Sequence, residues 1–227
     1  MGVSYNSVLN RDGLVLHLCA NVPRSYPGSG TTWYDISGNN NHGSMLGGVT
    51  YLSSNGGAMD FDGADDRVDV SSNLNLKVTN LTLSSWLYMK TSPNVDRENA
   101  IVFDTGSQDA YGFRIKNGGT ASLQGWYFIL GGSGLFYNTT AHNVWYHVTG
   151  TCGPSGLAMY INGNLISSAP SPTIVSYSTG GTQRFFIGSN GSISWPIRVD
   201  DLRIYNRELL SSEIKQIFNS TRKRFGV

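Results

Sequence analysis

The feature that most constrains the fold of this 227-residue chain is the alternation of apolar and polar residues in short runs, separated by glycine, asparagine and serine. Runs such as "LTLSSWLYMK", "GWYFILGG" and "VWYHVTGTC" are typical of β-strands with one buried face. In "LAMYINGNLISSA", the pair Asn162-Gly163 predicts a tight hairpin, because both residues tolerate a positive φ. About a dozen such runs without intervening helices predict a sandwich of antiparallel sheets.

One stretch near the C-terminus has the periodicity of an α-helix. In "NRELLSSEIKQIFNSTRKRF", an apolar face is formed by Leu210, Ile214, Ile217 and Phe218. Ser211 or Ser212 can cap the first turn of this short C-terminal helix. We expect the helix to close one end of the sandwich, within a single domain of residues 11–227 that follows an N-terminal arm of residues 1–10.

Composition excludes several classes of partner. The net charge of +1 at pH 7 argues against nucleic-acid binding, because phosphates need a basic patch. No apolar stretch approaches the roughly 18 residues that a membrane span needs, so we expect no membrane insertion. The start, "MGVSYNSVLNRDG", lacks the pattern of a signal peptide, and two cysteines do not make a disulfide framework. These features predict a protein made in a reducing cytoplasm.

Several blocks of the sequence carry a family resemblance. "WYDISGNNNHGS", "AMDFDGADDRVDV", "VWYHVTGT", "LAMYINGNLISS" and "VDDLRIYNRELLSSEI" occur in order within residues 13–217. They resemble the laminin-G-like domains of the concanavalin A-like lectin/glucanase superfamily. That resemblance implies an all-β jelly-roll sandwich of two antiparallel sheets, in agreement with the strand pattern.

Two of these regions have a narrower resemblance. "CANVPRSYPGSGTTWYDISGNNNHGS" and the ending "IYNRELLSSEIKQIFNSTRKRFGV" are similar to free-standing laminin-G-like proteins of tailed bacteriophages. The similarity implies a virion structural protein, such as a head decoration, a fibre or a tail appendage, made in the host cytoplasm. Its partners would be other virion proteins and further copies of itself. The alternative is a carbohydrate-binding lectin module that attaches to host or environmental glycans.

Catalysis is not expected. "FDGADD" brings Asp62, Asp65 and Asp66 close together, and paired carboxylates can hydrolyse glycosides. That chemistry needs two acids facing each other across a cleft, whereas adjacent acids on a glycine turn are usually solvated. The glucanases of the superfamily carry Glu-x-Asp-x-x-Glu along one strand, and this sequence has no such pattern. We therefore expect a protein that is not an enzyme.

The stretch "DISGNNNHG", which begins at Asp35, has the oxygen ligands that calcium prefers. It combines one carboxylate with several amides and with main-chain carbonyls next to glycine. The resemblance implies a structural Ca²⁺ here, held by Asp35, Asn39 and Asp200. The alternative is a turn held by the hydrogen bonds of asparagine and aspartate side chains.

Strand alternation gives an independent reason to expect that Asp200 has a binding partner. Leu202 and Ile204 should point into the core, and Asp200 lies on the same face, so its buried carboxylate needs a partner. One departure from the phage pattern counts against calcium. Cys19 stands where those relatives often carry an acid, and calcium does not use a soft sulfur ligand.

Two aromatic residues are candidates for sugar binding. Trp126 and Tyr127 in "LQGWYFILGG" could stack on a sugar ring if they are exposed on a sheet. The alternative is that they fill the core of the sandwich, as tryptophan and tyrosine often do. His147, in "VWYHVTG", is expected to pack within a strand.

Overall fold

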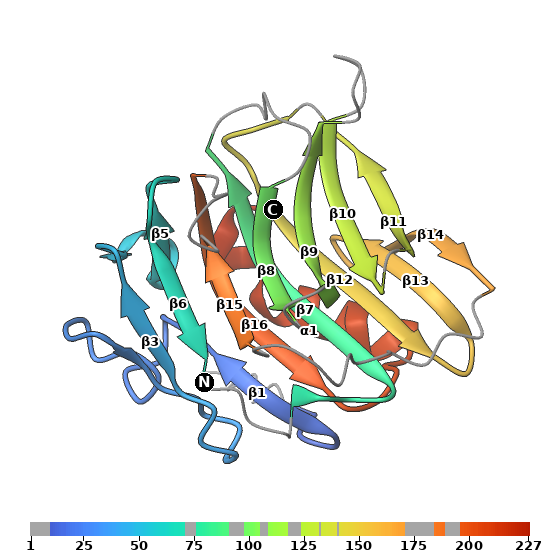
Figure 1. The fold of residues 1–227 in the computed structure, drawn as a ribbon, viewed down its shortest axis with the longest axis horizontal. Helices are drawn as coiled ribbons and strands as arrows, with labels where there is room; N and C mark the ends of the chain where they lie inside the picture. The colour runs from blue at the N-terminus through green and yellow to red at the C-terminus, as the bar shows by residue number, and fades with distance from the viewer. Residues whose placement is uncertain are drawn as a thin grey trace, which may run out of the picture.

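Two antiparallel sheets of eight strands each face one another in the computed structural model, within the part of the chain that it describes (Figure 1). That part comprises residues 10–70, 76–90, 98–104, 109–117, 124–131, 133–139, 141–170, 184–188 and 196–227. The predicted all-β jelly-roll sandwich of two antiparallel sheets is therefore confirmed.

We call the two layers the front sheet and the back sheet, after their positions in Figure 1. The front sheet runs in the order β11 (Ser133–Asn138), β10 (Gln124–Leu130), β9 (Asp109–Asn117), β8 (Glu98–Asp104), β15 (Arg184–Gly188), β6 (Arg67–Val70), β3 (Gly43–Leu46) and β2 (Thr32–Trp33). The back sheet runs in the order β14 (Asn164–Ala169), β13 (Gly156–Ile161), β12 (Trp145–Gly153), β7 (Leu81–Met89), β16 (Ile197–Tyr205), β5 (Ala58–Phe61) and β4 (Thr50–Leu52), and β1 (Leu14–Leu18) pairs with β16. A short 3₁₀ helix, η1 (Ser54–Gly56), follows β4.

The central strands of the back sheet are buried on both faces. In β7, Leu81, Leu83 and Leu87 belong to the main core. Trp86, with the opposite parity along the strand, packs in a separate apolar cluster with residues of the C-terminal helix. The back sheet therefore needs a second layer to cover its outer face.

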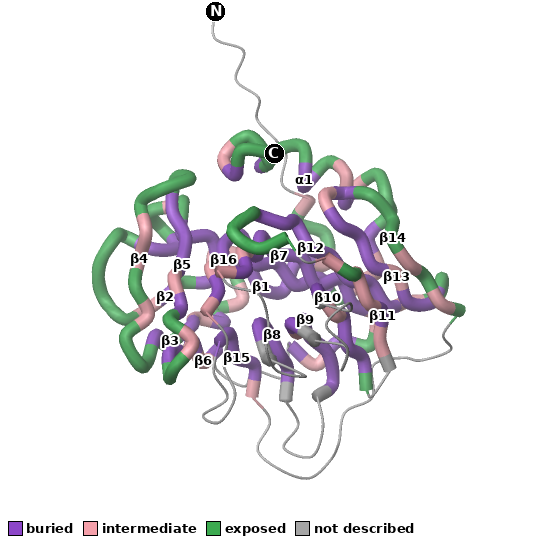
Figure 2. The backbone as a smooth tube through the Cα atoms, turned by 90° about the horizontal axis from the view of Figure 1, so that it is seen from above, coloured by how far each residue is buried: buried purple, intermediate pink, exposed green. Residues whose placement is uncertain are grey.

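The helix α1 (Ser211–Phe225) provides that second layer, and Figure 2 shows it lying over the back sheet on the side away from the front sheet. The Phe225 ring stacks on Trp86 with centroids 4.1 Å apart, and Phe218 stacks on the same indole at 5.8 Å. The expectation that the helix closes an end of the sandwich is wrong. It covers a sheet face, because that face carries large apolar side chains that water would otherwise contact.

The start of α1 also differs from the prediction. Leu209 is buried, whereas Leu210 is 67% exposed and does not belong to the apolar face. Instead of a serine cap, the Glu213 carboxylate accepts the Leu210 N–H at 2.8 Å and pairs with the Arg207 guanidinium at 2.7 Å. A glutamate at this position satisfies one of the unpaired amides of the first turn.

Two local features of the strands matter for the site. The pair Asn162-Gly163 forms the two-residue loop of the β13–β14 hairpin, with φ values of 52° and 71°, as predicted. In β16, a bulge between Asp200 and Arg203 interrupts the pairing with β7, and Asp201 there has a φ of 51°. A bulge adds one residue to the strand. Side chains after the bulge therefore point to the sheet face opposite to the one that regular alternation with the side chains before it would give.

The N-terminal arm is only partly tested. Residues 1–9 lie outside the described residues, and Asn10 donates a hydrogen bond to the Glu213 side chain. The boundary between residues 10 and 11 stays a prediction. Among the residues described, no helix combines the length and the apolarity of a membrane span.

The packing of α1 gives a testable expectation. Phe225→Ala should lower the free energy of unfolding by about 3 kcal/mol, because it removes the stacking partner of a buried indole and leaves a cavity. Gln216→Ala, at an exposed position of the same helix, should change it by less than about 0.5 kcal/mol. Urea denaturation of both variants measures this, and equal effects would contradict the packing described.

Candidate functional site

The polar loop after β2 is organised around one carboxylate. Oδ1 of Asp35 accepts hydrogen bonds from the backbone amides of His17 at 2.9 Å and Ser37 at 2.8 Å. Oδ2 accepts from the Ser37 hydroxyl at 2.8 Å and from the Asn41 amide at 3.0 Å. Four donors saturate the carboxylate, so Asp35 acts as the centre of a hydrogen-bonded loop.

The asparagine side chains tie the same loop to β1. Asn39 donates from Nδ2 to the Leu14 carbonyl at 3.1 Å, and Asn41 donates from Nδ2 to the Val15 carbonyl at 2.8 Å. His42 accepts the Asp35 amide at 3.0 Å through Nδ1. These contacts are those expected for a turn held by asparagine and aspartate side chains.

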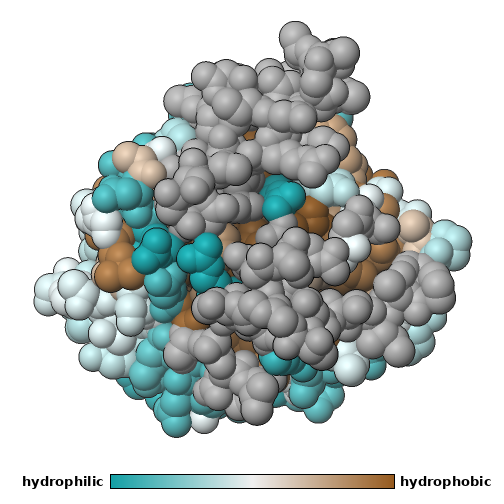
Figure 3. All heavy atoms as spheres, viewed as in Figure 1, coloured by the Kyte–Doolittle hydropathy of each residue, from teal (hydrophilic) through white to brown (hydrophobic). Residues whose placement is uncertain are grey.

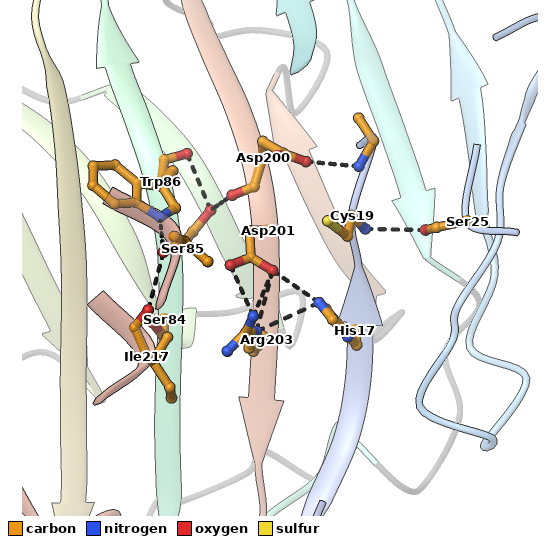
Figure 4. Close-up of polar contacts among 12 residues, drawn as sticks. His17, Cys19, Ser25, Ser84, Ser85, Trp86, Asp200, Asp201, Arg203 and Ile217 are labelled. Carbon is orange, nitrogen blue, oxygen red and sulfur yellow. Dashed lines mark hydrogen bonds and ion pairs between the residues drawn. The ribbon is translucent and has the colours of Figure 1, made fainter. Parts of the chain in front are cut away.

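Asp200 lies in a different environment, next to Asp201 on β16, as Figure 4 shows. Its Oδ1 accepts the Ala20 amide at 2.6 Å, and its Oδ2 pairs with the Arg224 guanidinium from the last turn of α1. The regular alternation with Leu202 and Ile204 is wrong, because the bulge at Asp201 turns Asp200 toward the helix. The predicted need for a partner is confirmed, and described protein groups supply it.

These contacts bear on the predicted Ca²⁺ at Asp35, Asn39 and Asp200. One carboxylate is saturated by N–H and O–H donors, and the other faces a guanidinium, which would repel a cation. The Asn39 amide directs its nitrogen at carbonyl and hydroxyl oxygens. The three side chains as folded do not fit a calcium ion, and calcium at this position stays a prediction for experiment to decide.

Next to Asp200 lies a second buried ion pair. Arg203 donates to both carboxylate oxygens of Asp201 at 2.9 Å, and His17 Nε2 lies 2.8 Å from Asp201 Oδ1 (Figure 4). Burial alone would raise the pKa of Asp201, but Arg203 and His17 hold it well below its usual range. Burial lowers the pKa of His17, against the hydrogen bond to Asp201. The group joins β1 to β16 beneath the helix.

Cys19 completes a His-Cys-Asp group whose possible ligand atoms lie within 4.8 Å of one another. The group does not fit a metal ion, because Arg203 already occupies both oxygens of Asp201. Burial strongly raises the pKa of the Cys19 thiol, so it stays protonated. We interpret this group as a structural clamp rather than a reactive site.

Trp126 and Tyr127 point in opposite directions. Trp126 is fully buried in the core between the sheets, so its predicted role in sugar stacking is wrong, and the core alternative is right for this residue. Tyr127 is partly exposed and, by alternation along β10, belongs to the outer face of the front sheet. Of the two predicted residues, only Tyr127 lies where a ligand can reach a sheet face.

The Tyr127 ring lies across the neighbouring strand. A Cβ atom on Gly134 of β11 would come within 2.6 Å of Cζ of this ring, so the glycine leaves the space that the ring fills. Arg114 of β9 and Phe136 of β11 are its register partners on either side, and both are partly exposed. The outer face therefore presents an aromatic ring beside a guanidinium.

The same face continues toward β6 over an apolar floor whose side chains are only 0–4% exposed, so a ligand cannot contact them in the structure as folded. Ile129, Val102 and Phe186 are buried but lie outside the core between the sheets, and register places them in one row across four strands. The Arg184 guanidinium lies 5.0 Å from the centroid of the Phe186 ring. Figure 3 views the molecule from the side of the front sheet; among the residues that it colours, apolar ones are visible near the centre and polar ones beside them.

Sequence reasoning did not find Arg114, Arg184 or this floor. A signal was present in the sequence. A strand that carries apolar residues at both odd and even positions has two apolar faces, and each of them has to be covered. In "GWYFILGG", one face of the strand carries Trp126, Phe128 and Leu130, and the other carries Tyr127 and Ile129. The second set marks a second apolar face, on which Tyr127 is partly exposed and Ile129 is buried.

Two facing antiparallel sheets define a β-sandwich, and the outer face of one of them carries a partly exposed tyrosine beside an arginine. Residues 62–215 match the family model described as the concanavalin A-like lectin/glucanases superfamily. The chain belongs to this family. A comparison with curated proteins finds no match.

Solved structures support the fold. The chain is similar to a Trypanosoma rangeli sialidase, with 18% identity and a TM-score of 0.69, over 93% of this chain and 33% of the sialidase. A structure of that sialidase in complex with sialic acid matches with 16% identity and a TM-score of 0.67, over 93% and 33% of the two chains. A botulinum neurotoxin type C, which depends on interaction with two ganglioside molecules to enter cells, matches with 21% identity and a TM-score of 0.64, over 93% of this chain and 52% of the toxin chain. The chain thus spans between a third and about half of these structures.

The buried His147 gives a prediction for pH dependence. It packs between Trp86 and Phe218, as expected for a histidine within a strand, and burial lowers its pKa to about 3. Below about pH 6.5 the unfolded chain binds a proton there that the native protein does not, so stability falls as the pH falls toward 3.

The stability advantage of the wild type over His147→Gln should therefore shrink by about 1 kcal/mol per pH unit between pH 6 and 5. Asp200, whose pKa burial raises to about 6, titrates with the opposite sign but is common to both proteins and cancels. Urea denaturation at several pH values measures the difference. A constant difference between pH 7 and 5 would show that His147 is not buried as a neutral base.

Proposed function

We propose that this protein is a non-enzymatic glycan-binding module, and that it binds sugars on the outer face of the front sheet. The observation that carries the proposal is the pairing of Tyr127 with Arg114 on that face, in a chain with a lectin-like fold. Tyr127 supplies a ring on which the apolar side of a sugar packs, and Arg114 supplies donors for hydroxyl or carboxylate oxygens.

The chemistry of the face favours acidic sugars. Arg114 is partly exposed beside Tyr127, and a planar guanidinium binds a carboxylate through two parallel hydrogen bonds. Arg184 is also partly exposed on this face, but register places it at the other end of β8, opposite Asp104, whereas Arg114 lies opposite Asn99. The structural relatives are consistent with this class, since they include a sialidase in complex with sialic acid and a toxin that interacts with gangliosides. We therefore propose sialylated or other carboxylate-bearing glycans as the ligands.

The virion role remains a separate prediction. It came from the resemblance of "CANVPRSYPGSGTTWYDISGNNNHGS" and the C-terminal segment to bacteriophage proteins, and the comparisons do not support that resemblance. Virion partners, self-association and assembly in a host cytoplasm stay predictions with it. Glycan binding does not depend on them, because a module with this face would bind sugar on a particle or free in solution.

The test is a glycan array followed by titration calorimetry with the best sialylated oligosaccharide. Tyr127→Ala and Arg114→Ala should each weaken binding at least about tenfold, because each removes a contact worth more than about 1.4 kcal/mol. Tyr34→Ala and Arg222→Ala, at exposed positions outside the front sheet, are the matched controls and should bind like the wild type.

Circular dichroism and melting temperatures establish that each variant is folded. If no glycan binds the wild type, the proposed function is wrong. If a glycan binds and both front-sheet variants keep wild-type affinity, the ligand is a glycan but the proposed face is wrong.

A further inference from the structure

Three acids gather on the "FDGADD" turn, which leads from β5 of the back sheet to β6 of the front sheet. Carboxylate oxygens of Asp62, Asp65 and Asp66 lie within 4.8 Å of one another. Calcium binds oxygen at 2.3–2.6 Å, so two ligands of one ion are separated by at most about 5 Å. The spacing of the three carboxylates is therefore that of a ligand set.

The buried member of this group is incompletely satisfied. Asp66 is 4% exposed, whereas Asp62 and Asp65 are exposed. Oδ2 of Asp66 accepts the Asp62 amide at 2.8 Å, but Oδ1 is buried and has no hydrogen-bond partner in the part of the chain described. A buried carboxylate oxygen without a donor, beside two like charges, is unfavourable unless a positive charge joins it.

No protein cation supplies that charge among the described residues. The neighbouring Arg67 pairs instead with Asp69, with Nε 2.7 Å from Oδ1. The counter-charge must therefore be either a proton on Asp66 or a bound cation.

A glycine turn lies directly against the acids. A Cβ atom on Gly48 would be 3.3 Å from Oδ1 of Asp66, and one on Gly47 would be 2.4 Å from the Asp65 carbonyl oxygen. Both glycines have positive φ values, of 82° for Gly47 and 122° for Gly48. Backbone rather than side chains therefore lines this side of the cluster, and main-chain oxygens are ligands that calcium accepts.

We propose that Asp62, Asp65 and Asp66 bind a calcium ion. Three carboxylates and nearby main-chain groups match the hard oxygen ligands of Ca²⁺, and the flexible geometry of this ion suits a turn. The bound ion neutralises Asp66 Oδ1 and fixes the crossing between the two sheets. This site is separate from the loop at Asp35 and does not rest on glycan binding.

The experiment uses the full chain, freed of metal by chelation, and measures binding of CaCl₂ by calorimetry and by the melting temperature. The wild type should bind one ion and melt at least about 5 °C higher when calcium is a hundredfold above its Kd. Asp66→Asn should abolish binding and, without calcium, should melt no lower than the wild type, because it removes a buried charge. Asp62→Asn with Asp65→Asn, at exposed positions, should also abolish binding.

Asp12→Asn, at an exposed acid elsewhere, is the matched control and should bind like the wild type. Asp35→Asn and Asp200→Asn distinguish this site from the calcium position predicted from the sequence, and both should keep the calcium response. The proposal is overturned if the wild type binds no calcium, which would leave a proton on Asp66 as the counter-charge. It is also overturned if the response survives Asp66→Asn, or if only the Asp35 and Asp200 variants lose it.

Discussion

The packing of α1 on the back sheet is the interaction on which the rest of the arrangement depends. Apolar stacking on Trp86 and the ion pair between Arg224 and Asp200 fix the last turns of the helix, and the pairing of Glu213 with Arg207 fixes its first turn. With the outer face covered by the helix, the central strands of the back sheet are buried on both sides. Of the two sheets, the front one has no described helix over its outer face, and this asymmetry gives the two layers different roles.

The buried charges under the helix follow from the same arrangement. Two strands pair with the same edge of β16. β5 pairs with it as far as Val199, and β1 pairs with it from Leu202 onward. The bulge at Asp201 falls between these two partners, and Arg203 and His17 close around it. Such groups are stable only when every charge is paired, because removing one partner of a buried pair costs about 3–5 kcal/mol. We interpret this network of charges as a structural feature that fixes the register of β16 against its neighbours, rather than as a catalytic site.

The sequence predicted those features that depend on short-range patterns. Alternating runs predicted the two-sheet sandwich, and Asn162-Gly163 predicted its hairpin, because both follow from local backbone preferences. Alternation showed that Trp126 and Tyr127 face opposite sides of a strand, but it could not show which side is the core. The direction of Asp200 was mispredicted because a single extra residue, Asp201, reverses alternation, and two adjacent acids in an apolar run were the only local sign of it. Contacts between distant segments, such as Arg224 with Asp200, leave no periodic signal.

The proposed function has one central claim, that sugars bind to the outer face of the front sheet around Tyr127 and Arg114. The direct test is a titration of ¹⁵N-labelled protein with a sialylated oligosaccharide, followed by amide chemical shifts in NMR spectra. Our account predicts that the largest shifts fall on β9 and β10, around Arg114 and Tyr127. Shifts concentrated on α1 or on the loop that begins at Asp35, with the front sheet unchanged, would contradict it.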